Sequence, residues 1–104
     1  MEKSYLDLLN EFKTNPRDVH TVPLGKRSYK WFYVYVDNGA LYVESAKDKL
    51  PRCSLKKRML YKKEFNEILS LYIKRKKSVP VSQEAMKCTQ SQVYWYGIFN
   101  EMNW

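Results

Sequence analysis

Residues 4–13 carry apolar side chains at the spacing of one helix face. Ser4 comes directly before the apolar stripe, and Asp7 follows Ser4 by three positions, which is an acidic variant of the capping box. Asn15-Pro16 ends the pattern. The sequence therefore predicts an N-terminal helix with one apolar stripe. The residues of that stripe are Tyr5, Leu8, Leu9 and Phe12.

Two alternating segments, residues 29–37 and 40–46, flank the dipeptide Asn38-Gly39. Asn-Gly favours a two-residue hairpin, because a type I′ turn needs positive φ at both central positions. Since side chains alternate along a strand, the turn predicts two different faces. One face carries Phe32, Val34, Val36, Leu41 and Val43, and the other carries Trp31, Tyr33, Tyr35, Tyr42 and Glu44. Residues 18–24 predict a short edge strand, because Pro23 cannot donate a ladder hydrogen bond.

The aliphatic face of this hairpin is the natural core, whereas the aromatic face has two interpretations. A row of rings beside Lys30 is what a platform for single-stranded nucleic acid needs, because bases stack on aromatic side chains. Alternatively, the apolar segment 93–99 covers this face and forms a second layer. The rings concerned are Trp31, Tyr33, Tyr35 and Tyr42.

The second half of the chain predicts two helices. Apolar residues at helical spacing between Tyr61 and Ile73 indicate a basic amphipathic helix over about 55–77, with an alternative start after a break near Met59-Leu60. Residues 89–92 form a capping-box pattern before a strongly apolar segment, which predicts a C-terminal helix over about 90–102. Residues 82–92 also suggest a helix-turn-helix, but the turn lacks glycine and a plain helical hairpin fits better.

The composition places the chain among small globular α+β proteins of one domain, residues 1–104. A hydrophobic content of 44% is too high for a disordered chain. No apolar run is long enough to span a membrane, and the start of the chain lacks the apolar region of a signal peptide. We therefore expect a cytoplasmic protein in which Cys53 and Cys88 are reduced. Two cysteines and a single histidine do not fill a zinc site, so we expect no metal and no cofactor.

The net charge of +8 comes from one segment. Residues 47–77 contain twelve basic and three acidic residues, whereas the rest of the chain contains seven basic and eight acidic ones. Clustered cations bind a phosphate backbone by releasing counterions, although a solvated helix face is the plainer explanation. The candidate phosphate-binding residues are Lys47, Lys49, Arg52, Lys56, Lys57, Arg58, Lys62, Lys63, Lys74, Arg75, Lys76 and Lys77.

These patterns support three functional hypotheses. The leading one is a small nucleic-acid-binding accessory or regulatory protein of the bacterial or phage type, with DNA or RNA as its partner. The second is a protein-binding module, such as a small inhibitor that docks on an acidic partner, because Tyr, Trp and Arg dominate binding hot spots. The third is a toxin-type ribonuclease, for which His20 is the one side chain poised near neutral pH. No catalytic motif accompanies His20, so an enzyme is the less favoured hypothesis.

Overall fold

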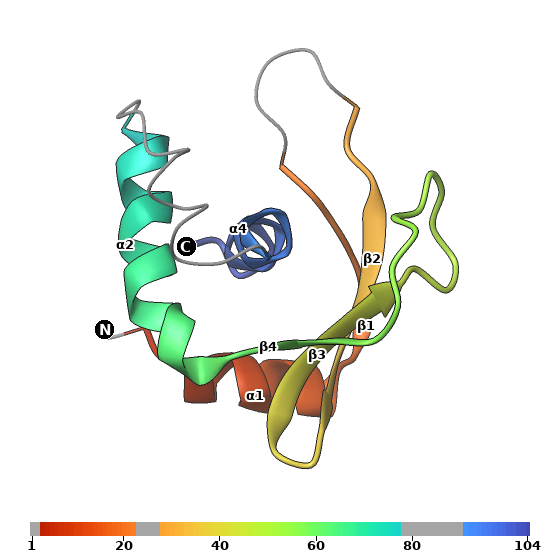
Figure 1. Cartoon of the computed structure of the whole chain (residues 1–104), viewed down its shortest axis with the longest axis horizontal. Helices are drawn as coiled ribbons and strands as arrows, with labels where there is room; N and C mark the ends of the chain where they lie inside the picture. The colour runs from red at the N-terminus through yellow and green to blue at the C-terminus, as the bar shows by residue number, and fades with distance from the viewer. Residues whose placement is uncertain (1–2, 23–27, 78–90) are drawn as a thin grey trace.

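The computed structural model describes residues 3–22, 28–77 and 91–104, which form an α+β fold of three helices and one antiparallel sheet (Figure 1). The elements are α1 (Tyr5–Thr14), β1 (Arg17–His20), β2 (Trp31–Asp37), β3 (Ala40–Ser45), β4 (Arg58–Leu60), α2 (Lys62–Lys76) and α4 (Gln92–Glu101). The strand order β1-β2-β3-β4 follows the chain, so each strand pairs with the next. Figure 1 shows α4 between α2 and the curved sheet, with α1 beneath them.

The hairpin of β2 and β3 has the register that the sequence predicts. Asn38 and Gly39 both have positive φ, at 50° and 73°, as a type I′ turn requires. Val34 lies opposite Val43 and Tyr35 opposite Tyr42, so the two faces of the hairpin carry the predicted residues. β1 pairs with β2 at the edge of the sheet, which confirms the predicted edge strand over its first half.

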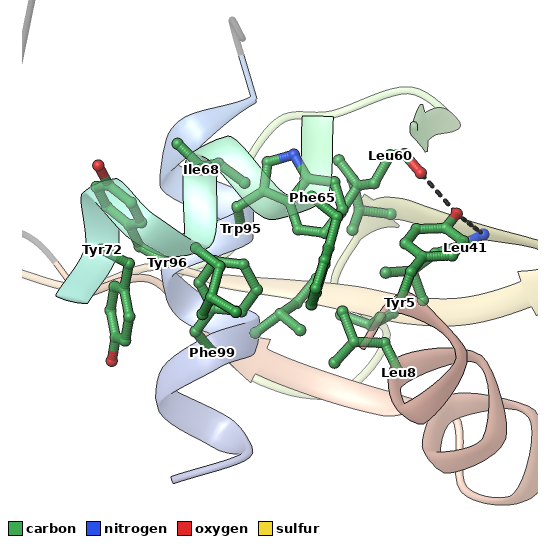
Figure 2. Packing of buried hydrophobic residues seen from close by; sticks show 14 of the residues in the cluster. Tyr5, Leu8, Leu41, Leu60, Phe65, Ile68, Tyr72, Trp95, Tyr96 and Phe99 are labelled. Atoms are coloured by element: carbon green, nitrogen blue, oxygen red, sulfur yellow. Dashed lines mark hydrogen bonds between the residues drawn. The ribbon is translucent and has the colours of Figure 1, made fainter. Parts of the chain in front are cut away.

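The helices all pack on the aliphatic face of the sheet, where one core forms. Side chains of β1, β2, β3 and β4 meet those of α1, α2 and α4 in a single buried cluster, part of which Figure 2 shows. The members with no exposed surface are Leu8, Phe12, Phe32, Val34, Leu41, Val43, Leu60, Ile68, Trp95, Ile98 and Phe99. The opposite face of the sheet, by contrast, has no helix of the described residues on it.

The capping box of α1 is present, and the first residue of the helix also joins two strands. Ser4 Oγ accepts the N–H of Asp7 at 3.2 Å, and Asp7 Oδ2 accepts the N–H of Ser4 at 2.9 Å. The hydroxyl of Tyr5 accepts the N–H of Leu41 at 2.9 Å and donates to the carbonyl of Leu60 at 2.7 Å (Figure 2). Tyr5 therefore bridges β3 and β4 from within the core.

The predicted start of the basic helix at about residue 55 is wrong. Residues 58–60 form β4, with Leu60 opposite Leu41 and Met59 opposite Tyr42, and α2 begins at Lys62. The alternative break near Met59-Leu60 is therefore the correct one. The physical reason is that residues 58–60 extend the sheet along the edge of β3, and in this pairing Leu60 is completely buried.

The prediction that the C-terminal apolar segment is helical is confirmed, but the alternative that it covers the aromatic face is wrong. α4 lies on the aliphatic face, where Tyr94 meets the ring of Phe32 edge-on at 5.2 Å. Gly97 permits this close approach, because a Cβ built there would lie 2.7 Å from the carbonyl oxygen of His20. The N-cap of α4 is Ser91, whose side chain makes no capping hydrogen bond.

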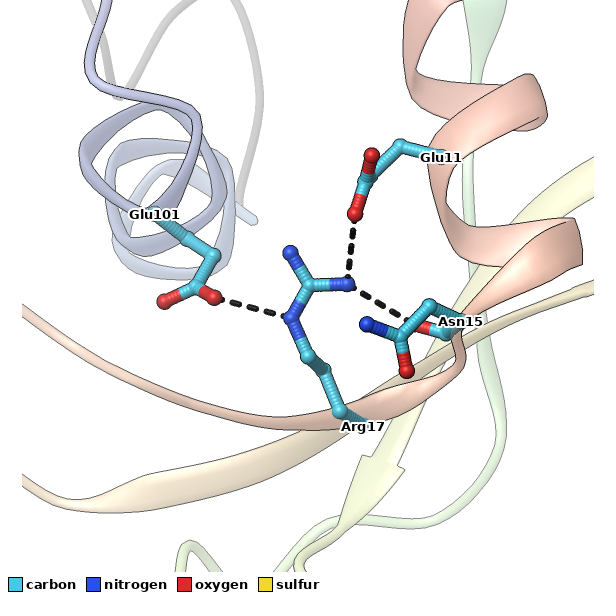
Figure 3. A network of polar contacts seen from close by, with 4 residues as sticks. All are labelled: Glu11, Asn15, Arg17 and Glu101. Carbon is cyan, nitrogen blue, oxygen red and sulfur yellow. Dashed lines mark hydrogen bonds and ion pairs between the residues drawn. The ribbon is translucent and has the colours of Figure 1, made fainter.

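Arg17 ties the two terminal helices to the edge strand. Its Nη1 lies 2.8 Å from Glu11 of α1, and its Nε lies 2.8 Å from Glu101 of α4 (Figure 3). The same Nη1 donates to the carbonyl of Asn15, and the guanidinium lies 4.7 Å from the ring centre of Phe12. One side chain thus joins segments more than eighty residues apart in sequence.

Several predictions fall on residues that the structure does not describe. They are the second half of the edge strand with Pro23, most of the helix-turn-helix at residues 82–92, Thr89 of the capping pattern, and Cys88. Cys53 is a free thiol. Among the described residues, no helix is both long enough and apolar enough to cross a membrane.

Candidate functional site

The sheet face opposite the helices, which we call the outer face, gathers the aromatic residues predicted from the hairpin. The strand pairing adds β1 and β4 to this face, since paired residues point the same way. The outer face therefore consists of Asp18, His20, Trp31, Tyr33, Tyr35, Asp37, Ala40, Tyr42, Glu44 and Met59. All ten residues are half-buried.

Three tyrosines on the outer face form a stacked column across β2 and β3. The ring centres of Tyr33 and Tyr35 are 5.6 Å apart with 30° between the ring planes, and those of Tyr35 and Tyr42 are 5.8 Å apart with 20°. The first pair are neighbours along one strand, and the second pair are directly opposite one another in the ladder. The predicted hairpin register is thus what aligns the rings.

A lysine ammonium lies over the tyrosine at each end of this column. Lys47 Nζ is 4.7 Å from the ring centre of Tyr33, and Lys57 Nζ is 4.5 Å from that of Tyr42. Both distances are in the range of a cation–π contact. Lys47, which is exposed, forms no ion pair with any residue that the structure describes.

Trp31 forms a second aromatic group beside the column. Its ring centre is 5.1 Å from His20 and 5.9 Å from Tyr29, and Lys49 Nζ lies 5.7 Å from it. A parallel bridge pairs Trp31 with Arg52, which brings the Arg52 side chain to the outer face as well. Tyr29 is the most accessible of these rings, with 49% of its surface exposed.

Asp18 holds the lysine-bearing loop against the sheet. Its carboxylate accepts the backbone N–H groups of Lys47, Asp48 and Lys49 at 2.8–3.0 Å. Burial on its own would raise the pKa of Asp18, but these three donors and the nearby Lys49 ammonium together lower it below the ordinary value. Asp18 stays ionised and fixes the point from which both lysine side chains leave the backbone.

The other carboxylates of the outer face are also engaged within the protein. Asp37 forms an ion pair with Lys57 at 2.8 Å, and this contact raises the pKa of the lysine. Burial raises the pKa of the Tyr35 phenol, and a hydrogen bond with Glu44 raises it further. Tyr35 is therefore neutral throughout the physiological pH range, and Glu44 takes part in a side-chain hydrogen bond.

The structure brings together only part of the predicted basic segment. Four of the twelve residues, Lys47, Lys49, Arg52 and Lys57, reach the outer face, and Lys56 is exposed between them. Arg58 turns to the helical side, where it donates to Ser91 and lies over Tyr94.

The remaining basic residues belong to α2 and its C-cap. Arg75 donates to the carbonyl of Val22 at 2.6 Å, and Lys76 donates to the carbonyl of Trp104. These two contacts are structural, since each ties α2 to another segment. Lys62, Lys63, Lys74 and Lys77 are exposed. The predicted second patch at 74–77 thus lies on the helical side of the molecule, away from the outer face (Figure 1).

Three members of the outer face lie outside the hairpin, on β1 and β4, and the hairpin pattern does not identify them. His20, which the sequence offers as a surface strand residue or a catalytic candidate, packs its ring against Tyr29 and Trp31, and its Nδ1 lies 2.8 Å from the carbonyl oxygen of Thr21. Asp18 and Met59 reach the face only through strand pairing. The alternation of β1 was a usable signal for Asp18 and His20, but the sequence holds no signal that places residues 47–49 over Asp18.

The described residues hold no group of three or more His, Cys, Asp or Glu side chains able to bind a metal ion. No protein-family model, curated protein or solved structure matches the chain.

Proposed function

We propose that this protein binds nucleic acid and that the outer face, rather than the whole basic segment, makes the contact. The observation that carries the proposal is the tyrosine column, with one lysine ammonium over Tyr33 and a second over Tyr42. Aromatic rings and cations lie side by side on a face that no helix of the described residues covers, which suits a ligand with both bases and phosphates. Lys49 and Arg52 beside Trp31 extend the same chemistry along the sheet.

The salt dependence of binding follows from the number of cations on the outer face. Each phosphate contact contributes a slope of about −0.7 for a single strand, or about −0.9 for duplex DNA, to log affinity against log salt. For three or four contacts, affinity should fall roughly 20- to 150-fold between ~50 and ~200 mM salt. Twelve contacts would give a far steeper loss, so the slope distinguishes the outer face from the whole segment.

Fluorescence anisotropy with labelled oligonucleotides at several salt concentrations tests this proposal. The variant Lys47→Gln/Lys49→Gln/Lys57→Gln should bind at least tenfold more weakly and show a slope reduced by about two to three contacts. The matched control Lys62→Gln/Lys74→Gln/Lys77→Gln removes the same charge from α2 and its C-cap and should change affinity little. Absence of binding at ~50 mM salt, or equal losses in the two triple variants, would refute the outer face as the contact.

A second candidate function is protein binding, and the mixed charge of the outer face favours it. Asp18, Asp37 and Glu44 are interleaved with the cations, whereas a polyanion site gains nothing from carboxylates. Tyr and Trp are also the commonest hot-spot residues of protein interfaces. Recovery of one stoichiometric partner that survives nuclease treatment, and that the Lys47/Lys49/Lys57 variant fails to retain, would support this candidate.

A further inference from the structure

We infer that the outer face selects single strands with unpaired bases, and that binding exchanges lysine-on-ring contacts for base-on-ring contacts. This inference rests on the proposed function and names the class of nucleic acid. Its basis is the occupancy of the ring faces in the free protein. Neighbouring rings of the column contact one another, and Lys47 Nζ lies over the Tyr33 ring. Lys57 Nζ lies 4.5 Å from the ring centre of Tyr42 and 6.0 Å from that of Tyr35.

The ammonium groups of Lys47 and Lys57 are able to move away from the tyrosine rings that they cover. Each has a long, flexible stem with an exposed side chain, and Lys47 has no carboxylate within 4 Å among the described residues. Lys57 has one partner, Asp37, and both members of that pair are about half exposed, so the pair is weak. A phosphate offers a full negative charge and several acceptor oxygens, so it competes well with an aromatic ring for the ammonium.

Departure of the lysines uncovers the part of the Tyr33 ring under Lys47 and the part of the Tyr42 ring under Lys57. A flat base can then stack on Tyr33 or Tyr42 while the phosphate beside it holds the displaced lysine. Both contacts form only if the base is not already stacked between neighbouring bases in a duplex. The phosphates of a duplex can bind the lysines, but its stacked bases cannot stack on the tyrosine rings, which is the physical reason for a single-strand preference.

The Trp31 group offers a further stacking position of the same kind. Tyr29 is half exposed, and Lys49 is exposed at 5.7 Å from the Trp31 ring, without an ion pair to any residue in the described ranges. The Asp18 carboxylate accepts the backbone N–H groups of Lys47 and Lys49, and we call this set of hydrogen bonds the Asp18 clamp. It fixes the backbone of both lysines before a ligand arrives. The clamp therefore leaves only the side chains free to exchange partners.

A comparison of one labelled sequence as a single strand and as a duplex, at the same salt concentration, tests the inference. The wild-type protein should bind the single strand at least tenfold more tightly. Tyr42→Leu removes the ring and should weaken single-strand binding by about five- to a hundredfold while leaving duplex binding and the salt slope unchanged. Tyr42→Phe keeps the ring and should retain the affinity. Tyr61→Leu, at an exposed tyrosine before α2, is the matched control and should have no effect.

The outcomes separate this inference from the proposed function. Equal affinity for single strand and duplex, with binding still lost in the Lys47/Lys49/Lys57 variant, would overturn the exchange and leave nucleic-acid binding standing. A single-strand preference that Tyr42→Leu does not change would also overturn it. Binding of neither form would refute the proposed function itself. The wild-type comparison stands even if Tyr42→Leu fails to fold, and Tyr29→Leu at the half-exposed ring then replaces it.

Discussion

At Gly97 helix α4 lies very close to the sheet, and replacing this glycine with alanine tests how α4 is held. A Cβ at this position would lie 2.7 Å from the carbonyl oxygen of His20 and 3.0 Å from two ring carbons of Phe32. The first contact is with backbone, so no side-chain rotation relieves it. α4 or β1 must therefore move by several tenths of an ångström in a core where both neighbours are already well packed.

Two opposing contributions set the size of the effect. Alanine in a helix interior is about 1 kcal/mol more favourable than glycine. Overpacking of a well-packed core costs about 1–3 kcal/mol, and an unrelieved backbone contact belongs at the upper end of that range. The net result should be a loss of about 2 kcal/mol in the free energy of unfolding. For a domain of this size, that is a fall in Tm of roughly 10 °C.

Thermal denaturation followed by circular dichroism, with urea titration for the free energy of unfolding, measures this effect. Asn100→Ala is the matched control, because Asn100 is exposed in the same helix and its replacement gains helix propensity without a close contact. The control should be unchanged or slightly more stable. A Gly97→Ala variant as stable as the wild type, or more stable, would show that α4 is not held against β1 as described.

Three further changes test other contacts. Tyr5→Phe should cost about 1–3 kcal/mol in unfolding free energy, since the buried N–H of Leu41 loses its acceptor. Burial raises the pKa of Tyr5 above 10.0, so the stability that its neutral hydroxyl contributes is present below pH 10 and is lost as the pH rises further. In urea titrations above pH 10, the unfolding free energy of the wild type should therefore fall more than that of the Tyr5→Phe variant. Asp18→Asn should release residues 47–49, seen as faster hydrogen exchange of their amides. Because the pKa of Asp18 is lowered, the stability that its carboxylate contributes is present above pH 3.8 and is lost as the pH falls below that value. Acid unfolding of the Asp18→Asn variant at the same pH as the wild type would contradict this role of the carboxylate. Arg17→Ala should cost about 1–2 kcal/mol and accelerate proteolysis near both terminal helices, whereas unchanged proteolysis would argue against its bridging role.

The parts of the fold that the sequence predicted are those with local causes. The Asn38-Gly39 turn requires positive φ and fixes the hairpin register, and the Ser4–Asp7 capping box fixes the start of α1. The start of α2 could not be predicted in the same way. Leu60 pairs with Leu41, nineteen positions earlier in the chain, and nothing near residue 60 distinguishes a helix start from a strand that pairs with a distant partner.

The candidate site shows the same division between local and long-range causes. Alternation along β2 and β3 predicted the aromatic row correctly. It did not predict whether α4 covers that row, since both faces of the hairpin carry large apolar surfaces. Gly97 is the residue that allows α4 to dock on the aliphatic face. The lysines of the 47–49 loop depend on Asp18, about thirty positions away, and only the folded structure reveals that contact.

Buried and outward-facing side chains alternate along β2, and this alternation determines which of its positions can be substituted without loss of the fold. Phe32 and Val34 are buried in the core, whereas Tyr33 and Tyr35, which alternate with them along β2, lie on the outer face. Structural and ligand-facing positions are thus interleaved one by one along the same strand, and each can be substituted without its neighbour. A library of variants at the outward positions alone should yield folded proteins with new binding preferences. A single-residue insertion within β2, by contrast, would turn the tyrosines into the core and should abolish folding.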